Sequence, residues 1–76
     1  MAREQVTEIL AEMVANVMAI EVAPGDPVAV GQTVCLLESM KMEIPVISEH
    51  EGTVAGVYVT AGDVVQEGDV LLSITP

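Results

Sequence analysis

The chain contains very few cations and almost no aromatic side chains. Its 76 residues include no Phe or Trp, one Tyr, and two Lys or Arg against twelve Asp or Glu, which gives a net charge of −10. Such a chain repels phosphate backbones and anionic membrane surfaces, and it lacks a stacking platform for single-stranded bases. We therefore expect no nucleic-acid and no membrane partner, but basic surfaces on partner proteins.

The chain also has few of the groups that staple small domains. Cys35 is the only cysteine and His50 the only histidine, so no internal disulfide and no metal-ligand cluster is expected. Cys35 lies in an apolar run typical of a core thiol, and His50 is expected to be a solvated loop residue. No nucleophile–base pattern or phosphate-binding loop is visible, so we expect no catalytic residue.

Long apolar runs are absent as well. No stretch approaches the roughly 18 apolar residues of a membrane span, and the N-terminus shows no signal-peptide pattern. A free thiol without an export signal fits a reducing cytoplasm, which is the expected location. The length predicts one domain over 1–76, with 1–5 expected to be disordered, stabilised by its aliphatic residues.

A weak internal duplication organises the sequence. Under a shift of 37 residues, Val17, Val22, Gly25, Asp26, Val28 and Gly31 fall on Val54, Val59, Gly62, Asp63, Val65 and Gly68. Glycine followed by a small polar residue between β-branched runs is typical of turns between short strands. The duplication therefore predicts two halves related by a pseudo-twofold axis.

The duplication also resolves an ambiguity near the N-terminus. Apolar residues at 6, 9, 10, 13 and 14 match the spacing of an amphipathic helix. Residues 7–15, however, correspond to 44–52, where Pro45 and Gly52 disfavour a helix. We therefore expect strand in both places. The expected strands cover 6–10, 14–22, 27–30, 33–38, 43–47, 53–59, 64–67 and 70–75, packed as a flattened barrel or sandwich.

Lys41 is the only lysine, and it lies where the two halves join. It has no counterpart, because the equivalent position would fall beyond residue 76. By symmetry, the two chain ends are expected at the opposite pole. A single primary amine at a defined turn is an unambiguous target for covalent attachment, although chance placement of a rare cation is the alternative.

The octet Glu-Ser-Met-Lys-Met-Glu-Ile-Pro at 38–45 resembles the attachment hairpin of the biotinyl domain family, whose core is Met-Lys-Met. The resemblance extends over about 6–75, including Val17 to Asp26, Gly52 to Val54, and the later Gly-Asp pairs. It implies an all-β, eight-stranded barrel-sandwich hybrid of two pseudo-twofold halves, with the attachment lysine on the joining hairpin. The short link from Asp26 to Gln32 is similar to that of members without a protruding thumb.

The resemblance implies a non-catalytic carrier. Biotin would be joined to Lys41 by a biotin protein ligase, and the resulting arm would carry carboxylate between biotin carboxylase and carboxyltransferase subunits of an acyl-CoA-type carboxylase or transcarboxylase. Met40 and Met42 would shape the surface that these enzymes recognise, although gap-filling is what methionine usually does. At a tight turn, at least one of the two is expected to be exposed.

The other residues of the hairpin carry weaker expectations. Glu38 and Glu43 are candidates for ligase recognition, although solvated strand ends are the plainer interpretation. Ser39 stands where the family commonly has alanine, which keeps a small residue but can alter ligase recognition. Ala15 stands where the family often has glycine, which bears on close strand packing there.

Two other functions stay open at this point. A lipoyl carrier shares the architecture, but its lysine typically follows aspartate and precedes alanine, unlike Met40 and Met42. An unmodified β-module that takes part in protein–protein interaction is the third hypothesis, because no host enzyme is visible in the sequence.

Overall fold

The computed structural model describes residues 6–76, so the disorder expected over 1–5 lies outside the described residues. The described chain forms eight strands. They are β1 (Thr7–Leu10), β2 (Ala15–Ile20), β3 (Pro27–Val28), β4 (Thr33–Ser39), β5 (Met42–Ile47), β6 (Gly52–Val57), β7 (Val64–Val65) and β8 (Val70–Thr75). Nowhere in 6–76 is there a helix long and apolar enough to cross a membrane.

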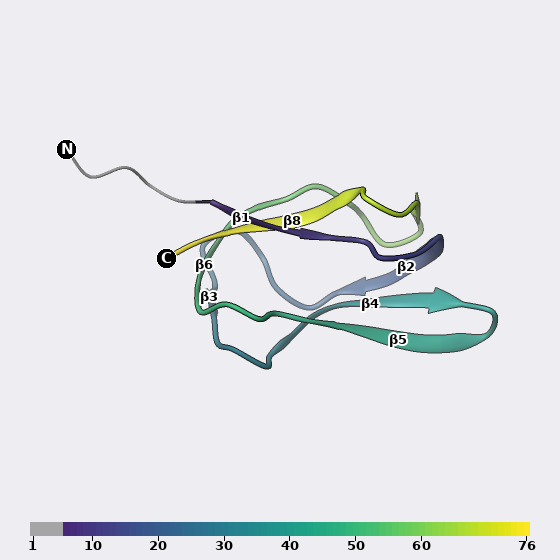
Figure 1. Cartoon of the computed structure of the whole chain (residues 1–76), viewed down its shortest axis with the longest axis horizontal. Coiled ribbons are helices and arrows are strands. Elements are labelled where there is room, and N and C mark those ends of the chain that lie inside the picture. The colour runs from purple at the N-terminus through teal and green to yellow at the C-terminus, as the bar shows by residue number, and fades with distance from the viewer. Residues whose placement is uncertain (1–5) are drawn as a thin grey trace.

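The strands form two four-stranded antiparallel sheets, in the orders β1-β8-β6-β3 and β5-β4-β2-β7 (Figure 1). The expected all-β barrel-sandwich hybrid is therefore confirmed. The N-terminal segment is a strand, as the duplication predicted, because β1 pairs with β8 from Thr7 opposite Ile74 to Leu10 opposite Val70. The spacing of its apolar residues would also suit a helix, but pairing with the distant β8 makes the segment a strand.

The duplication is visible in every part of the architecture. A shift of 37 residues places β2 on β6 and β3 on β7 with identical bounds, and it converts one sheet order into the other. Even the irregularities repeat. The β2–β4 pairing skips Met18, and the β6–β8 pairing skips the equivalent Ala55. The two halves therefore share one local design.

Four strands end two residues earlier than the sequence predicted. The strands expected to reach 22 and 59 end at Ile20 and Val57. The other two are β3 and β7. We expected strands over 27–30 and 64–67, but β3 and β7 end at Val28 and Val65. The cause is an earlier turn. The Gln32 N–H donates to the Ala29 carbonyl at 3.1 Å, and the equivalent Asp69 N–H donates to Gln66 at 3.0 Å.

The Gly-Asp turns that were predicted from sequence have the same geometry in both halves. Gly25 and Gly62 have φ of 93° and 99°, a region that glycine adopts without a side-chain clash. Each following aspartate accepts a backbone hydrogen bond, from Ala23 to Asp26 at 2.9 Å and from Thr60 to Asp63 at 2.8 Å. These side-chain bonds fix the turn independently of the sheets.

The core lies between the sheets and takes equivalent residues from both halves. Val17 and Val54 are each 2% exposed, and Val34 and Leu71 are each 0% exposed. Cys35 is also fully buried, as expected for a core thiol. Because the core contains no aromatic ring, its stability rests on many small aliphatic contacts.

The two poles of the molecule differ. At one pole, β1 and β8 bring the start and the end of the described chain side by side; at the other, the β4–β5 hairpin projects beyond the sandwich (Figure 1). This is the arrangement that the duplication predicted. Lys41 therefore lies at the end of the molecule that is remote from the chain ends.

Candidate functional site

The β4–β5 hairpin closes with a turn of two residues. Ser39 and Met42 face each other as the last pair of the ladder, which leaves Met40 and Lys41 as the turn. Their φ angles are 53° and 64°. Positive φ at both central residues is the mark of a type I′ turn, whose twist matches that of the flanking strands.

The residue types in this turn are unusual for its geometry. Type I′ turns favour Asn-Gly, because most side chains disfavour positive φ. Met40 and Lys41 are the only non-glycine residues with positive φ in the described chain. A left-handed conformation at such residues costs about 1 kcal/mol or more each. The backbone strain and the lone lysine thus coincide at one turn.

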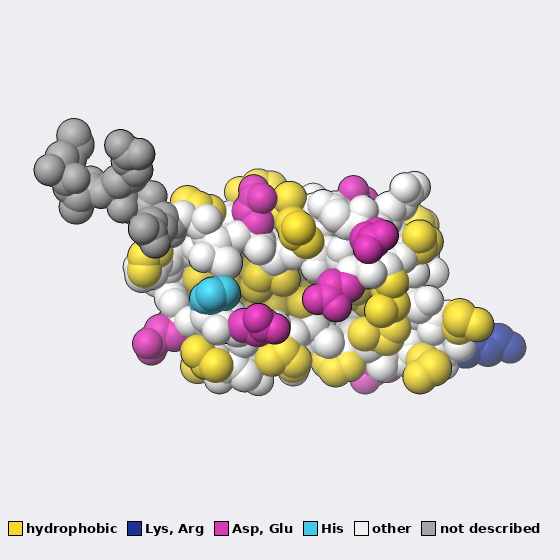
Figure 2. All heavy atoms as spheres, viewed as in Figure 1, with side chains coloured by type: hydrophobic (Ala, Val, Ile, Leu, Met, Phe, Trp, Pro, Cys, Tyr) yellow, Lys and Arg dark blue, Asp and Glu magenta, His cyan; other side chains and the backbone are white. Residues whose placement is uncertain are grey.

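The turn presents its side chains to solvent. Met40 is 90% exposed and Met42 65% exposed, so both methionines are outside the core, and the expectation that at least one would be is confirmed. Lys41 is exposed, and Ser39 is half-buried. In Figure 2, the dark blue of lysine and arginine shows only at the tip of the hairpin, beside apolar side chains.

Glu38 and Glu43 lie directly opposite each other, one pair below Ser39 and Met42. Both are exposed to solvent. Like charges across a ladder destabilise it slightly, so neither carboxylate is placed for the stability of the hairpin. Whether they serve ligase recognition stays a prediction.

The hairpin stands on a buried base. Leu37, opposite Ile44, is 2% exposed and faces the core. Cys35, two residues further down β4, is fully buried. Burial raises the pKa of the Cys35 thiol above its usual range, and the nearby Glu21 charge adds to this effect. The tip is therefore an exposed extension of rigid strands, and the thiol beneath it is not poised as a nucleophile.

The remaining polar candidates have structural surroundings. His50 is exposed in the loop between β5 and β6, as expected. Ser48, which no sequence pattern singled out, is fully buried. The Ser48 hydroxyl donates to the His50 backbone carbonyl at 2.6 Å rather than to the imidazole. Within 6–76, no group of three potential ligand side chains could hold a metal ion.

Ala15, where closer packing was in question, is 5% exposed and lies opposite Val65. Its counterpart Gly52 is far more constrained. A Cβ atom there would lie 2.1 Å from the Thr75 carbonyl oxygen and 2.8 Å from Ile74 Cγ2. The two equivalent positions therefore differ in the space that they leave.

Comparison with known proteins gives a family match over most of the chain. Residues 5–74 match the family described as "Biotin-requiring enzyme". The chain is 46% identical over 68 residues to the Biotinylated protein TB7.3 homolog of Mycobacterium leprae, covering 90% of this chain and 96% of that protein. It is 45% identical over 64 residues to the Biotin/lipoyl attachment protein of Bacillus subtilis, covering 84% and 88%.

Larger proteins contain a similar unit. The human mitochondrial propionyl-CoA carboxylase alpha chain is 42% identical over 76 residues, which cover 93% of this chain and 10% of that one. A single-chain, multi-domain long-chain acyl-CoA carboxylase superposes with a TM-score of 0.87 at 28% identity, over 92% of this chain and 7% of that one. The lipoyl domain of the Azotobacter vinelandii 2-oxoglutarate dehydrogenase complex shares the fold, with a TM-score of 0.72 at 23% identity over 99% and 98% of the two chains.

Proposed function

Because the chain belongs to the biotin/lipoyl attachment family, we propose that it is a biotin carrier in which biotin is joined to Lys41. One observation carries this proposal. The only lysine of the chain occupies the exposed two-residue turn of the hairpin that joins the two halves. An amide bond at this turn would extend a free arm from the exposed tip of the hairpin.

The chain contributes presentation rather than bond-making. The ligase would first activate the carboxyl group of biotin with ATP. The Lys41 Nζ, having given up a proton, would then attack that carboxyl carbon, and the amide would form as the adenylate group leaves. The exposed turn leaves Nζ accessible, and Met40 and Met42 provide soft apolar surface on both sides. Ser39, half-buried at the end of β4, pairs with Met42 directly below the turn.

Once attached, biotin supplies a ring nitrogen that holds carboxylate. The hairpin fixes the point from which the biotin arm extends. Because the sandwich beneath it is rigid, the biotin can reach only enzyme sites close to that point. Tethering of this kind raises the effective concentration of the carried group without any new contact. The strained left-handed turn points Lys41 away from the sandwich, and this position is where a carrier needs its attachment point.

The partners that we propose are a biotin protein ligase and the biotin carboxylase and carboxyltransferase of an acyl-CoA-type carboxylase or transcarboxylase, acting in the cytoplasm. The carboxylases named above support this assignment, because a similar unit forms about a tenth of their length or less. The chain itself is then a non-catalytic carrier.

The test is the intact mass of the chain after co-expression with an active biotin ligase in the presence of biotin. We expect the mass to rise by one biotinyl group, and Lys41→Arg to abolish the increase while leaving the fold intact. Arginine keeps the positive charge but offers no acylable amine. An unmodified wild-type chain would overturn the proposal, and so would a modified Lys41→Arg chain.

The same sample separates the lipoyl alternative. The likeness to the lipoyl domain is below 25% identity and bears on the fold alone. The methionines that flank Lys41 favour biotin. An avidin blot alongside an anti-lipoyl blot should be positive only with avidin; the reverse pattern would replace the proposed cofactor.

A further inference from the structure

A groove of about 910 Å³ runs between β1 and β5, which are each one of the two outer strands of their sheet. Its two walls are related by the duplication. It reaches Ile44 at the base of the lysine hairpin, but Met40, Lys41 and Met42 do not line it. The groove is therefore distinct from the proposed attachment site.

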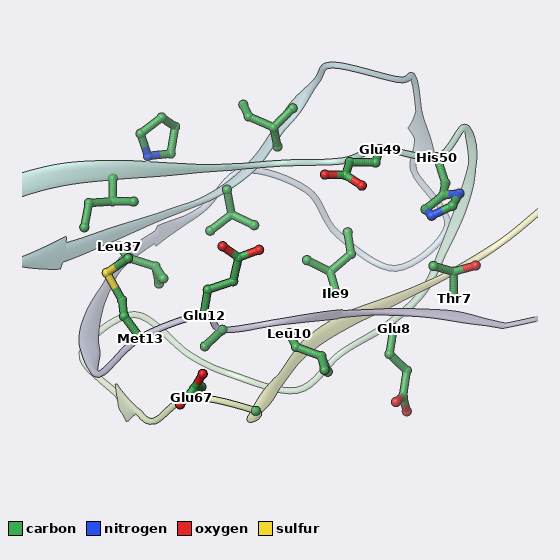
Figure 3. A pocket seen from close by; sticks show the side chains of 16 residues that line it. Thr7, Glu8, Ile9, Leu10, Glu12, Met13, Leu37, Glu49, His50 and Glu67 are labelled. Atoms are coloured by element: carbon green, nitrogen blue, oxygen red, sulfur yellow. The ribbon is translucent and has the colours of Figure 1, made fainter.

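The lining of the groove is strongly aliphatic. Ile9 and Val46, which are equivalent positions, pack partly buried against the core. Leu10 and Ile47, another equivalent pair, are each 43% exposed. In Figure 3, Ile9 projects into the space between the two strands. The Leu10 side chain points away from that space, so this exposed aliphatic surface lies along the rim of the groove (Figure 3). Exposed aliphatic side chains along such a rim indicate a surface that a partner covers.

The charge of the groove has one sign. Glu8, Glu12, Glu49 and Glu67 line it, and no lysine or arginine of the described chain does. Glu12 and Glu49 are equivalent under the duplication, and both side chains extend into the space between the strands (Figure 3). An occupant with positive charge is favoured, and a second copy of this chain, with a net charge of −10, is disfavoured.

The backbone of β1 offers a free edge. Along an antiparallel ladder, hydrogen-bonded pairs of residues alternate with non-hydrogen-bonded pairs. The two-residue turn makes Ser39–Met42 a hydrogen-bonded pair. Three pairs further along, Leu36–Pro45 is therefore a non-hydrogen-bonded pair. The nitrogen of Pro45 thus faces outward, where its missing N–H breaks no ladder bond. Glu8, opposite Ser73, is the equivalent residue of β1. Among residues 6–76, no backbone group bonds to its N–H or carbonyl, so both can pair with another strand.

We propose that this groove binds an extended segment of a partner protein in which lysine or arginine alternates with aliphatic residues. The segment adds as a strand along β1, its aliphatic side chains cover Leu10 and Ile47, and its cations meet Glu12 and Glu49. Strand addition of this kind draws affinity from main-chain hydrogen bonds and specificity from alternate side chains. It goes beyond the carrier function and requires no biotin. The bound partner would leave Lys41 free.

The probe is a short capped peptide of alternating lysine and valine, titrated into the full-length, unmodified, ¹⁵N-labelled chain. We expect amide shifts confined to 7–13 and 44–50, and binding that weakens as salt is raised. A peptide with glutamate in place of lysine should not bind, and one with two central prolines should bind far more weakly. Shifts centred on the lysine hairpin, or no binding of the lysine–valine peptide, would overturn the proposal.

Matched variants separate the groove from general attraction to an acidic protein. Glu12→Gln with Glu49→Gln should weaken binding about tenfold, whereas Glu21→Gln with Glu38→Gln removes the same charge outside the groove and should have little effect. Equal effects of the two pairs would overturn the proposal.

A second pair of variants tests the backbone edge. Glu8→Pro should weaken binding about fivefold more than Glu8→Gln, because only the proline removes the outward N–H. Proline already occupies the equivalent position 45, so the fold accommodates it. If the two variants bind the peptide equally, strand addition along β1 is wrong. Binding by a Lys41→Arg chain should be unchanged, which keeps this test independent of biotinylation.

Discussion

The two halves of the molecule differ mainly in how they end. The half from β1 to β4 and the half from β5 to β8 share the bounds of their two middle strands, their bulges and their Gly-Asp turns. After β4 the chain continues into the Met40-Lys41 turn, whereas the equivalent end of β8 is the end of the described chain. The duplication therefore builds the scaffold, and the proposed function lies at the joint between the two halves.

The turns sharpen this comparison. Where a turn only reverses the chain, glycine takes the positive φ, as at Gly25 and Gly62. At the joint, Met40 and Lys41 take positive φ instead. A turn selected for stability alone would carry Asn-Gly. The strained residues at the joint fit a site selected for what it presents rather than for stability.

The largest effect is expected from making the two halves alike at positions 15 and 52. Gly52→Ala places a Cβ against the Thr75 carbonyl and should cost about 3 kcal/mol of unfolding free energy. Ala15→Gly, the reverse change in the first half, should cost only about 1 kcal/mol. Urea unfolding monitored by circular dichroism measures both. Equal losses would mean that the halves are packed alike there.

A smaller effect of opposite sign is expected at the joint. Replacing Met40 with Asn and Lys41 with Gly should stabilise the chain by about 1 kcal/mol, because both residues then suit positive φ. The matched control is Gly62→Ala, which has open space around it but a φ of 99° and should lose about 1 kcal/mol. Urea unfolding compares the two. A destabilised Asn-Gly hairpin would contradict the assignment of strain to this turn.

The smallest effect is a pH dependence that separates Cys35 from its counterpart Leu72. Burial raises the pKa of the folded thiol above its ordinary value of 9.0. Below that value both states keep the proton. Above it only the unfolded chain ionises, so the free energy of unfolding falls as pH rises through 9.0 and levels off above the raised folded value.

The control for this effect is Cys35→Val, which keeps an aliphatic side chain as in the other half. Between pH 8 and pH 10, a range that spans the ordinary pKa of the thiol, the unfolding free energy of the wild type should fall relative to that of the variant. Other groups titrate equally in both chains. A constant difference would show that the thiol is not desolvated.

Much of the fold could be predicted from sequence because the duplication supplied a second, clearer copy of each ambiguous segment. Residues 7–10 resemble a helix alone, but their equivalents contain Pro45, and the structure has strands in both places. The position of Lys41 at the joint followed from the same shift. Its role as the attachment residue stays a prediction.

Other features of the structure were predicted inexactly or not at all. Backbone hydrogen bonds of the following turns set the ends of β3 and β7. The sequence predicted both strand ends two residues too late. The close approach of Thr75 to Gly52 and the hydrogen bond of buried Ser48 were not predicted. The approach of Thr75 to Gly52 depends on strands that are far apart in the sequence. The Ser48 bond is local, but the full burial of Ser48 is set by the packed fold.

The sequence by itself determined the periodicity, the turns and the place of the single lysine, because these rest on side-chain alternation and on residues with restricted φ. Only the tertiary structure decided that β1 and β5 would be outer strands on the two sides of one acidic, aliphatic groove. The physical reason is that the order in which strands pair decides which strands are outer ones, and the packing of the two sheets decides where a groove forms. They appear only once the two halves have packed together.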